Sequence, residues 1–139
     1  MKKIELHIPN DLGYERIAME SAAAVARMMG FSEDRVEDLK TALAEACINA
    51  IEHASKKRKA EKLLVTLTVA ADRLQVDIYD KGEQFEIHDQ KPDIKSRMEG
   101  NVPSRGWGIF LIKNLVDSLE VSSTKEGNTT SMVIYLHRT

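Results

Sequence analysis

Five short segments of this chain alternate between apolar and polar residues, and this period of two predicts half-buried strands. In the first segment, isoleucine or leucine occupies every second position, and a charged residue or histidine fills the positions between. Turn-forming residues such as Pro9 and Gly127 bound the segments. The predicted strands are Lys3–Ile8, Val65–Val69, Leu74–Tyr79, Leu119–Thr124 and Thr129–His137.

Three further segments are predicted to be helices. The first extends to about Met29, contains several alanines that favour helix, and has Gly30 in place to end it. The second begins at Ser32, a capping residue followed by acids that suit the helix dipole, and reaches about Ser55. The third runs from Gly106 to about Val116. The residues predicted to share one face are Ile17, Ser21, Ala24, Val25 and Met28 in the first helix, and Val36, Leu39, Leu43, Cys47, Ala50 and Ala54 in the second.

The order of these elements predicts the fold class. One strand, two helices, two strands, a long loop, one helix and two strands form runs rather than a strict alternation, which favours an α+β fold. We expect a two-layer sandwich in which a mixed, mostly antiparallel sheet is covered on one face by about three helices. The 139 residues fit a single domain spanning positions 1–139.

A long segment without periodicity, Glu83–Ser104, separates the third predicted strand from the third helix. Two prolines and a glycine interrupt it. Loops of this length are uncommon in small domains and are often functional. We interpret the segment as a lid between two glycine-containing elements.

Composition narrows the classes of function. Hydrophobic residues make up 42% and charged residues 30% of the chain, as in ordinary globular proteins, and the net charge of -2 gives no general attraction to nucleic acid or anionic membranes. A single cysteine, Cys47, excludes an internal disulfide and suits a reducing cytosol. The chain starts without the apolar core of a signal peptide and contains no apolar run of membrane-spanning length. We therefore expect a cytoplasmic protein without a direct nucleic-acid or membrane partner.

The segment Ser104–Leu115 combines two glycines with an apolar helix. Gly106 and Gly108 have no Cβ, so the backbone there can bend sharply and approach a ligand closely. The helix that follows begins with unpaired N–H groups and the positive end of its dipole, which together favour a phosphate. A glycine pair before a helix is also often a simple tight turn, so the phosphate hypothesis depends on the other parts of a nucleotide site.

Glu45 and Asn49 lie four residues apart and therefore on one face of the second helix. They fall roughly opposite the apolar stripe, so their spacing alone favours two polar residues on a solvated face. In the alternative hypothesis Asn49 supplies an oxygen to Mg²⁺ and Glu45 serves as a general base, because magnesium in a nucleotide site takes few protein ligands.

Four other residues each allow two interpretations. Asp80, two residues before Gly82, is either a turn residue or a buried carboxylate that accepts a hydrogen bond from an adenine amino group. Arg105 is either a surface residue or a planar cation for a terminal phosphate. Trp107 either packs or contacts the lid, and Thr129 either only favours strand or holds a water beneath a ligand.

Three segments in this order resemble the conserved boxes of the ATPase superfamily that includes gyrase, heat-shock chaperones and histidine kinases. Glu45–Ala54 looks like its N-box, Asp80–Phe85 is similar to its first glycine box, and Gly106–Ile112 resembles its second. Within that superfamily the chain most resembles the anti-sigma-factor serine kinases of bacterial partner-switching systems. The residues at 111–117 and 127–136 and the compact length add to this resemblance, which covers essentially the whole chain.

The resemblance implies a role for each matching residue. Asn49 would coordinate Mg²⁺, and Glu45 would accept the proton of the attacking serine hydroxyl. Asp80 would bind the adenine amino group in a pocket shaped by Gly82, and Thr129 would support the adenine side.

The same resemblance implies that Gly106 and Gly108 cradle the phosphates, with Arg105 near the terminal one. Two residues depart from the family pattern. Gln84 stands where the first glycine box often has a second glycine, and Trp107 fills a place often held by a smaller aliphatic residue. Neither change removes an implied ligand of ATP.

The resemblance thus implies a serine protein kinase that transfers the γ-phosphate of ATP, with Mg²⁺, to a serine of an anti-anti-sigma protein. The same protein would hold a sigma factor inactive and form a homodimer. The alternative is a nucleotide-gated binding switch of the same fold with little or no kinase activity. Retention of Glu45 favours the enzyme.

Overall fold

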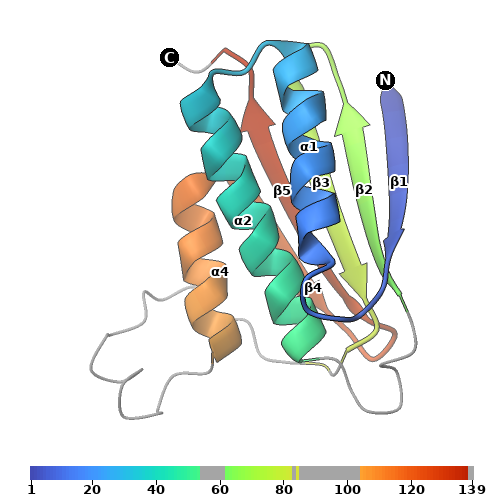
Figure 1. The fold of residues 1–139 in the computed structure, drawn as a ribbon. Coiled ribbons are helices and arrows are strands. Elements are labelled where there is room, and N and C mark those ends of the chain that lie inside the picture. Colours follow the sequence, from blue (N-terminus) through green and yellow to red (C-terminus); the bar gives the residue numbers. More distant parts are fainter. Residues whose placement is uncertain (54–61, 83, 85–103, 138–139) are drawn as a thin grey trace.

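All the helices that the structure describes lie on one face of a single sheet (Figure 1). This computed structural model describes residues 1–53, 62–82, 84 and 104–137, with side chains for all of these except 104–107. The helices are α1 (Glu15–Met29), α2 (Glu33–Glu52) and α4 (Ser104–Leu115), and the strands are β1 (Lys2–Ile8), β2 (Leu63–Val69), β3 (Arg73–Asp80), β4 (Ser118–Ser123) and β5 (Asn128–Tyr135). This arrangement confirms the predicted α+β sandwich. No helix in these ranges is long and apolar enough to cross a membrane.

The sheet has five strands in the order β1-β2-β3-β5-β4, and each of its four pairings is antiparallel. The expectation of a mixed sheet was therefore wrong in this detail. β2 and β3, like β4 and β5, are neighbours joined by short turns, which makes them antiparallel. The central pair, β3 and β5, brings Asp80 directly opposite Asn128 at one end of the sheet.

Helix α1 buries a different face from the predicted one. Its buried residues are Ala18, Ala22, Ala23 and Ala26. Ile17 is 51% exposed and Met28 is 87% exposed, although both belong to the face that the helical spacing grouped together. Alanine side chains are small enough for α1 to approach α2 closely, so the helix is packed by its smallest residues. The predicted end is confirmed, since Gly30 caps the helix with a left-handed φ of 97°.

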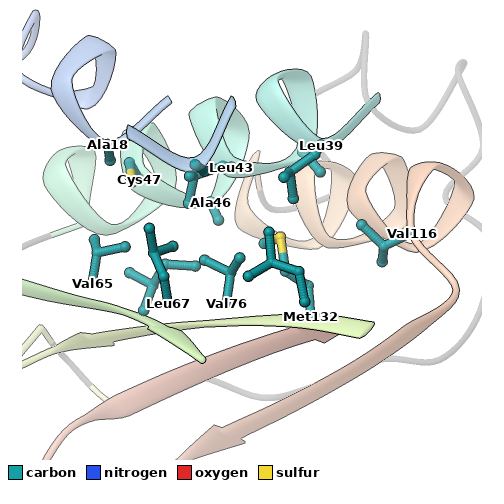
Figure 2. Packing of buried hydrophobic residues seen from close by; sticks show 14 of the residues in the cluster. Ala18, Leu39, Leu43, Ala46, Cys47, Val65, Leu67, Val76, Val116 and Met132 are labelled. Carbon is teal, nitrogen blue, oxygen red and sulfur yellow. The ribbon is translucent and has the colours of Figure 1, made fainter. Parts of the chain in front are cut away.

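Helix α2 is the central helix of the layer and buries the predicted stripe. Figure 2 shows Leu39 and Leu43 of this helix facing Val65, Val76 and Met132 of the sheet. Val36, Cys47 and Ala50 are buried as well, whereas Ala54 lies outside the described residues. Burial raises the pKa of the Cys47 thiol to about 12, so this side chain stays neutral and packs as a small apolar group.

An ion pair joins the first turn of α2 to the end of α4. Arg35 donates to Asp117 Oδ2 at 2.7 Å and to the carbonyl oxygen of Leu115, the last residue of α4, at 3.5 Å. The same carboxylate oxygen accepts from the backbone N–H of Tyr135 at 2.8 Å. The side chains of Arg35 and Asp117 are only 19% and 9% exposed. This pair therefore holds α4 against both α2 and β5.

We expect Asp117→Ala to lower the free energy of unfolding by about 2 kcal/mol, because it removes the closest acceptor of the largely buried Arg35 guanidinium and leaves, among the described residues, only the contacts to Asp38 and Leu115 at 3.5 Å. Urea denaturation of both proteins measures this loss. Glu33→Ala is the matched control, since it breaks the exposed Arg27–Glu33 pair and should cost much less. Equal losses for the two variants would show that the Arg35–Asp117 pair stabilises the fold no more than the exposed Arg27–Glu33 pair does.

Candidate functional site

A small pocket lies at the end of the sheet where β3 ends and β5 begins. Its lining comes from four elements of the fold. They are Ala46, Asn49 and Ala50 of α2, Asp80 of β3, Ile109 and Ile112 of α4, and Thr130 of β5. Four of these seven residues are aliphatic, and a carboxylate, an amide and a hydroxyl provide the polar groups.

Glu45 and Asn49 do not lie on a solvated face. Asn49 is only 6% exposed and Glu45 is half-buried, because α4 packs on this side of α2. At the contact stands Gly108, where a Cβ would overlap the Asn49 amide and lie 2.7 Å from Glu45 Oε1. Only a glycine fits there with these side chains in place. The structure therefore brings Glu45, Asn49 and Gly108 together.

Asp80 is a buried carboxylate rather than a solvated turn residue. It is 4% exposed, and its Oδ1 atom accepts hydrogen bonds from the Gly82 N–H at 2.8 Å and from Asn128 Nδ2 at 3.0 Å. A Cβ on Gly82 would lie 2.7 Å from that oxygen and 3.1 Å from the carbonyl oxygen of His53, at the C-terminal cap of α2. The glycine is required for this close approach.

Thr130, rather than the predicted Thr129, lines the pocket. Successive residues of a strand point to opposite faces of the sheet. Thr130 is on the helix-covered face with Met132, and Thr129 is on the other face. Thr129 is therefore outside the lining of this pocket, and Thr130 is the threonine in it.

The glycine pair lies inside a helix. Gly106 and Gly108 both belong to α4, which begins at Ser104, two residues earlier than predicted. Arg105 and Trp107 are in the same first turns, but their side chains lie outside the described residues. The proposed lid lies outside them as well, apart from its ends. Near one end, Gln84 Nε2 donates a hydrogen bond to the carbonyl oxygen of Ser123 in β4 at 3.3 Å. Gln84 is the residue that stands where the first glycine box often has a second glycine.

Sequence reasoning missed Asn128, a 1% exposed amide beside Asp80. Its position after Gly127 made it look like part of a turn. The pairing of β5 with β3 places Asn128 directly opposite Asp80. This register depends on how the strands pair in the sheet, so no local sequence pattern reveals it.

The oxygen donors of the site are too few to hold a metal ion by themselves, but they suit an ion that is also bound by the phosphates of a nucleotide. Within residues 1–53, 62–82 and 104–137, no group of three or more His, Cys, Asp or Glu side chains is placed to hold a metal ion. Magnesium bound with a nucleotide takes one or two protein oxygens and completes its shell with phosphate and water. The Asn49 amide oxygen beside Glu45 is a donor of that kind.

Comparison with known proteins agrees with this geometry. Residues 8–134 match the family described as Histidine kinase-like ATPase domain. The serine-protein kinase RsbW of Bacillus licheniformis is 34% identical over 139 residues, covering 97% of this chain and 86% of the relative. The serine-protein kinase RsbW of Bacillus cereus is also 34% identical, over 142 residues that cover 99% of this chain and 87% of the relative.

Two solved structures share the fold. The RsbU and RsbW domains of a Mycobacterium tuberculosis protein match all of this chain with a TM-score of 0.75 at 15% identity, and this chain spans 34% of that one. The histidine kinase domain of a blue-light-activated kinase from Erythrobacter litoralis matches 88% of this chain and 61% of its own with a TM-score of 0.57 at 16% identity. From the family match and the relatives that align along nearly its whole length, we conclude that this chain belongs to the histidine kinase-like ATPase family and, within it, to the family of the serine-protein kinase RsbW.

Proposed function

We propose that this protein is an ATP-dependent serine protein kinase and anti-sigma factor of the partner-switching type. The observation that supports it best is the meeting of Glu45 and Asn49 at Gly108, beside a pocket that contains Asp80. A candidate base, a candidate magnesium ligand and a candidate adenine acceptor then lie around one cleft between α2, α4 and the sheet. The names of its relatives, serine-protein kinase RsbW, support the same reaction.

The adenine would occupy the pocket at the end of β3. Asp80 would accept a hydrogen bond from the exocyclic amino group, and Gly82 would leave room for the base next to the backbone. Ile109 and Ile112 provide apolar contact for the ring. We assign the supporting hydroxyl to Thr130 because of its place in the lining.

The phosphates would lie toward the first turn of α4. The N–H groups at the start of α4, including that of Gly106, have no acceptor within the helix and can donate to phosphate oxygens, and Arg105 and Trp107 belong to the same turns. Asn49 would hold Mg²⁺ through its amide oxygen. When bound, the ion supplies positive charge that offsets the charge developing on the phosphate oxygens.

Transfer would proceed from a serine hydroxyl of the substrate protein. Its oxygen attacks the γ-phosphorus, the bond to the bridging oxygen of the β-phosphate breaks, and ADP leaves with that electron pair. Glu45 accepts the hydroxyl proton. Its half-buried position on α2, next to Asn49, is suited to this role, and its presence favours the kinase over a binding switch without chemistry.

The partners follow from the same proposal. The substrate is a serine of an anti-anti-sigma protein, and a sigma factor is the protein held inactive in the other nucleotide state. A homodimer and a cytoplasmic location belong to this proposal. The structural match to a chain with RsbU and RsbW domains supports a regulatory system of this kind.

Glu45→Gln should retain ATP binding and lose phosphoryl transfer by about 10²–10⁴-fold, since a positioned base contributes on that scale. The measurement is transfer from labelled ATP to an anti-anti-sigma protein, with ATP affinity by calorimetry. Glu52→Gln changes an exposed glutamate on the same helix and should transfer at the wild-type rate. Equal rates for Glu45→Gln and wild type would remove Glu45 from the mechanism.

Asp80→Ala should weaken ATP binding by roughly 10- to 100-fold, because a hydrogen bond to a charged group contributes roughly 1.5–3 kcal/mol. Calorimetric titration of ATP with Mg²⁺ measures the change. Asp77→Ala removes a carboxylate from the opposite face of the same strand and should leave the affinity unchanged. An unaltered dissociation constant for Asp80→Ala would refute the adenine assignment.

Gly108→Ala should weaken binding of ATP with Mg²⁺ by roughly tenfold, because its methyl group displaces the buried Asn49 side chain and overpacking costs about 1–3 kcal/mol. Binding is measured by calorimetry with and without Mg²⁺, and a larger loss in the presence of the ion is expected. Lys113→Ala on the exposed part of α4 is the control. Binding like that of wild type would mean that the position of Asn49 does not matter for the nucleotide.

A further inference from the structure

Three polar residues form a line across three neighbouring strands at the edge of the pocket. Asp80 at the end of β3 stands directly opposite Asn128 at the start of β5, and Asn128 stands directly opposite Ser123 at the end of β4. All three are on the helix-covered face of the sheet, where the next residues toward the middle are Ile78 on β3, Thr130 on β5 and Val121 on β4. Nothing in the proposed reaction so far uses Asn128 or Ser123.

The side chains of this line are joined by hydrogen bonds. The Ser123 hydroxyl donates to Asn128 Oδ1 at 2.5 Å, and Asn128 Nδ2 donates to Asp80 Oδ1 at 3.0 Å. Because its oxygen accepts from the hydroxyl, the amide must present its N–H groups to the carboxylate. Ser123 thereby sets the orientation of Asn128, and Asn128 in turn fixes one oxygen of Asp80.

Hydrogen bonds from the described part of the protein hold only one of the two carboxylate oxygens of Asp80. Both donors that the described residues provide to it, Asn128 Nδ2 and the Gly82 N–H, bond to Oδ1. Two N–H donors on one oxygen fix the plane of the carboxylate. The second oxygen, Oδ2, remains for a ligand in the pocket that Asp80 lines.

We propose that Asn128, oriented by Ser123, is a positioning residue that makes Asp80 select purines with an exocyclic amino group at the 6-position. This inference rests on the proposed nucleotide site. A 6-amino group can donate a hydrogen bond to Oδ2. The carbonyl oxygen of a 6-oxopurine is itself an acceptor, so it cannot bond to Oδ2, and both buried oxygens are left without a partner there. Loss of Asn128 frees the carboxylate to rotate, so discrimination between the two purines falls.

The experiment compares the dissociation constants of ATP and ITP, which differ at the 6-position, in wild type and Asn128→Ala, by calorimetry with Mg²⁺. Wild type should prefer ATP by tenfold or more. In the variant, ATP binding weakens by roughly tenfold while ITP binding changes little, so the preference largely disappears. Asn128→Asp keeps the shape but replaces the donor with an acceptor, and it should lose the preference as well.

A purely structural role for Asn128 predicts a different result. Loosened folding would weaken both nucleotides by the same factor and leave the ATP/ITP ratio at the wild-type value, which would overturn the inference. In transfer assays the positioning role also raises KM for ATP with kcat nearly unchanged. Failure of wild type to bind ATP is a separate outcome, which rejects the nucleotide site itself together with this inference.

Ser123→Ala provides a second variant with a smaller perturbation. It removes the hydroxyl that orients the amide, so the ATP/ITP ratio should fall part of the way toward that of Asn128→Ala. Ser122→Ala is the matched control, because Ser122 is the neighbouring serine on the opposite, exposed face of β4. An unchanged ratio in Ser123→Ala, with Asn128→Ala unfolded, would also overturn the proposal.

Discussion

The contact between α2 and α4 at Gly108 is the constraint on which the site depends. A side chain larger than hydrogen at this position would collide with Asn49 and Glu45. Because α4 can approach so closely, Asn49 is buried in the wall of the pocket, and Glu45 is half-buried beside Gly108. The same approach brings Ile109 and Ile112 over the end of the sheet, so the apolar walls and the polar pair have a common origin.

The far end of the same two helices explains why this contact can persist. There, Arg35 bonds both Asp117 and the last carbonyl of α4, and Asp117 also accepts from the backbone of β5. Helix α4 is therefore held by a largely buried ion pair at its C-terminus and by a glycine contact near its N-terminus. The apolar contacts of Ile112 and Val116 lie between them.

Much of this fold could be predicted from local patterns, but which residues face the protein interior in α1, α2 and β5 could not be fully predicted. Periodicity located the strands and the end of α1 at Gly30 because these depend on the residues themselves. It grouped Ile17 and Met28 on one face of α1, but both are exposed, and α1 is instead packed by its alanines. It left Glu45 and Asn49 undecided, since their burial depends on α4, more than fifty residues later in the chain. It did not show which of Thr129 and Thr130 lines the pocket, because neighbouring residues of a strand point to opposite faces and the register decides between them.

The polar site and the apolar core belong to one continuous surface. Along β3 the helix-facing residues are Leu74, Val76, Ile78 and then Asp80, and along β5 they are Ile134, Met132, Thr130 and then Asn128. Antiparallel pairing brings the two polar ends together at the same edge. There the carboxylate and the amide satisfy each other, which reduces the cost of burying them. The apolar part of the surface can then stabilise the fold while its polar end stays oriented toward a ligand, so the geometry of the site is an outcome of strand register.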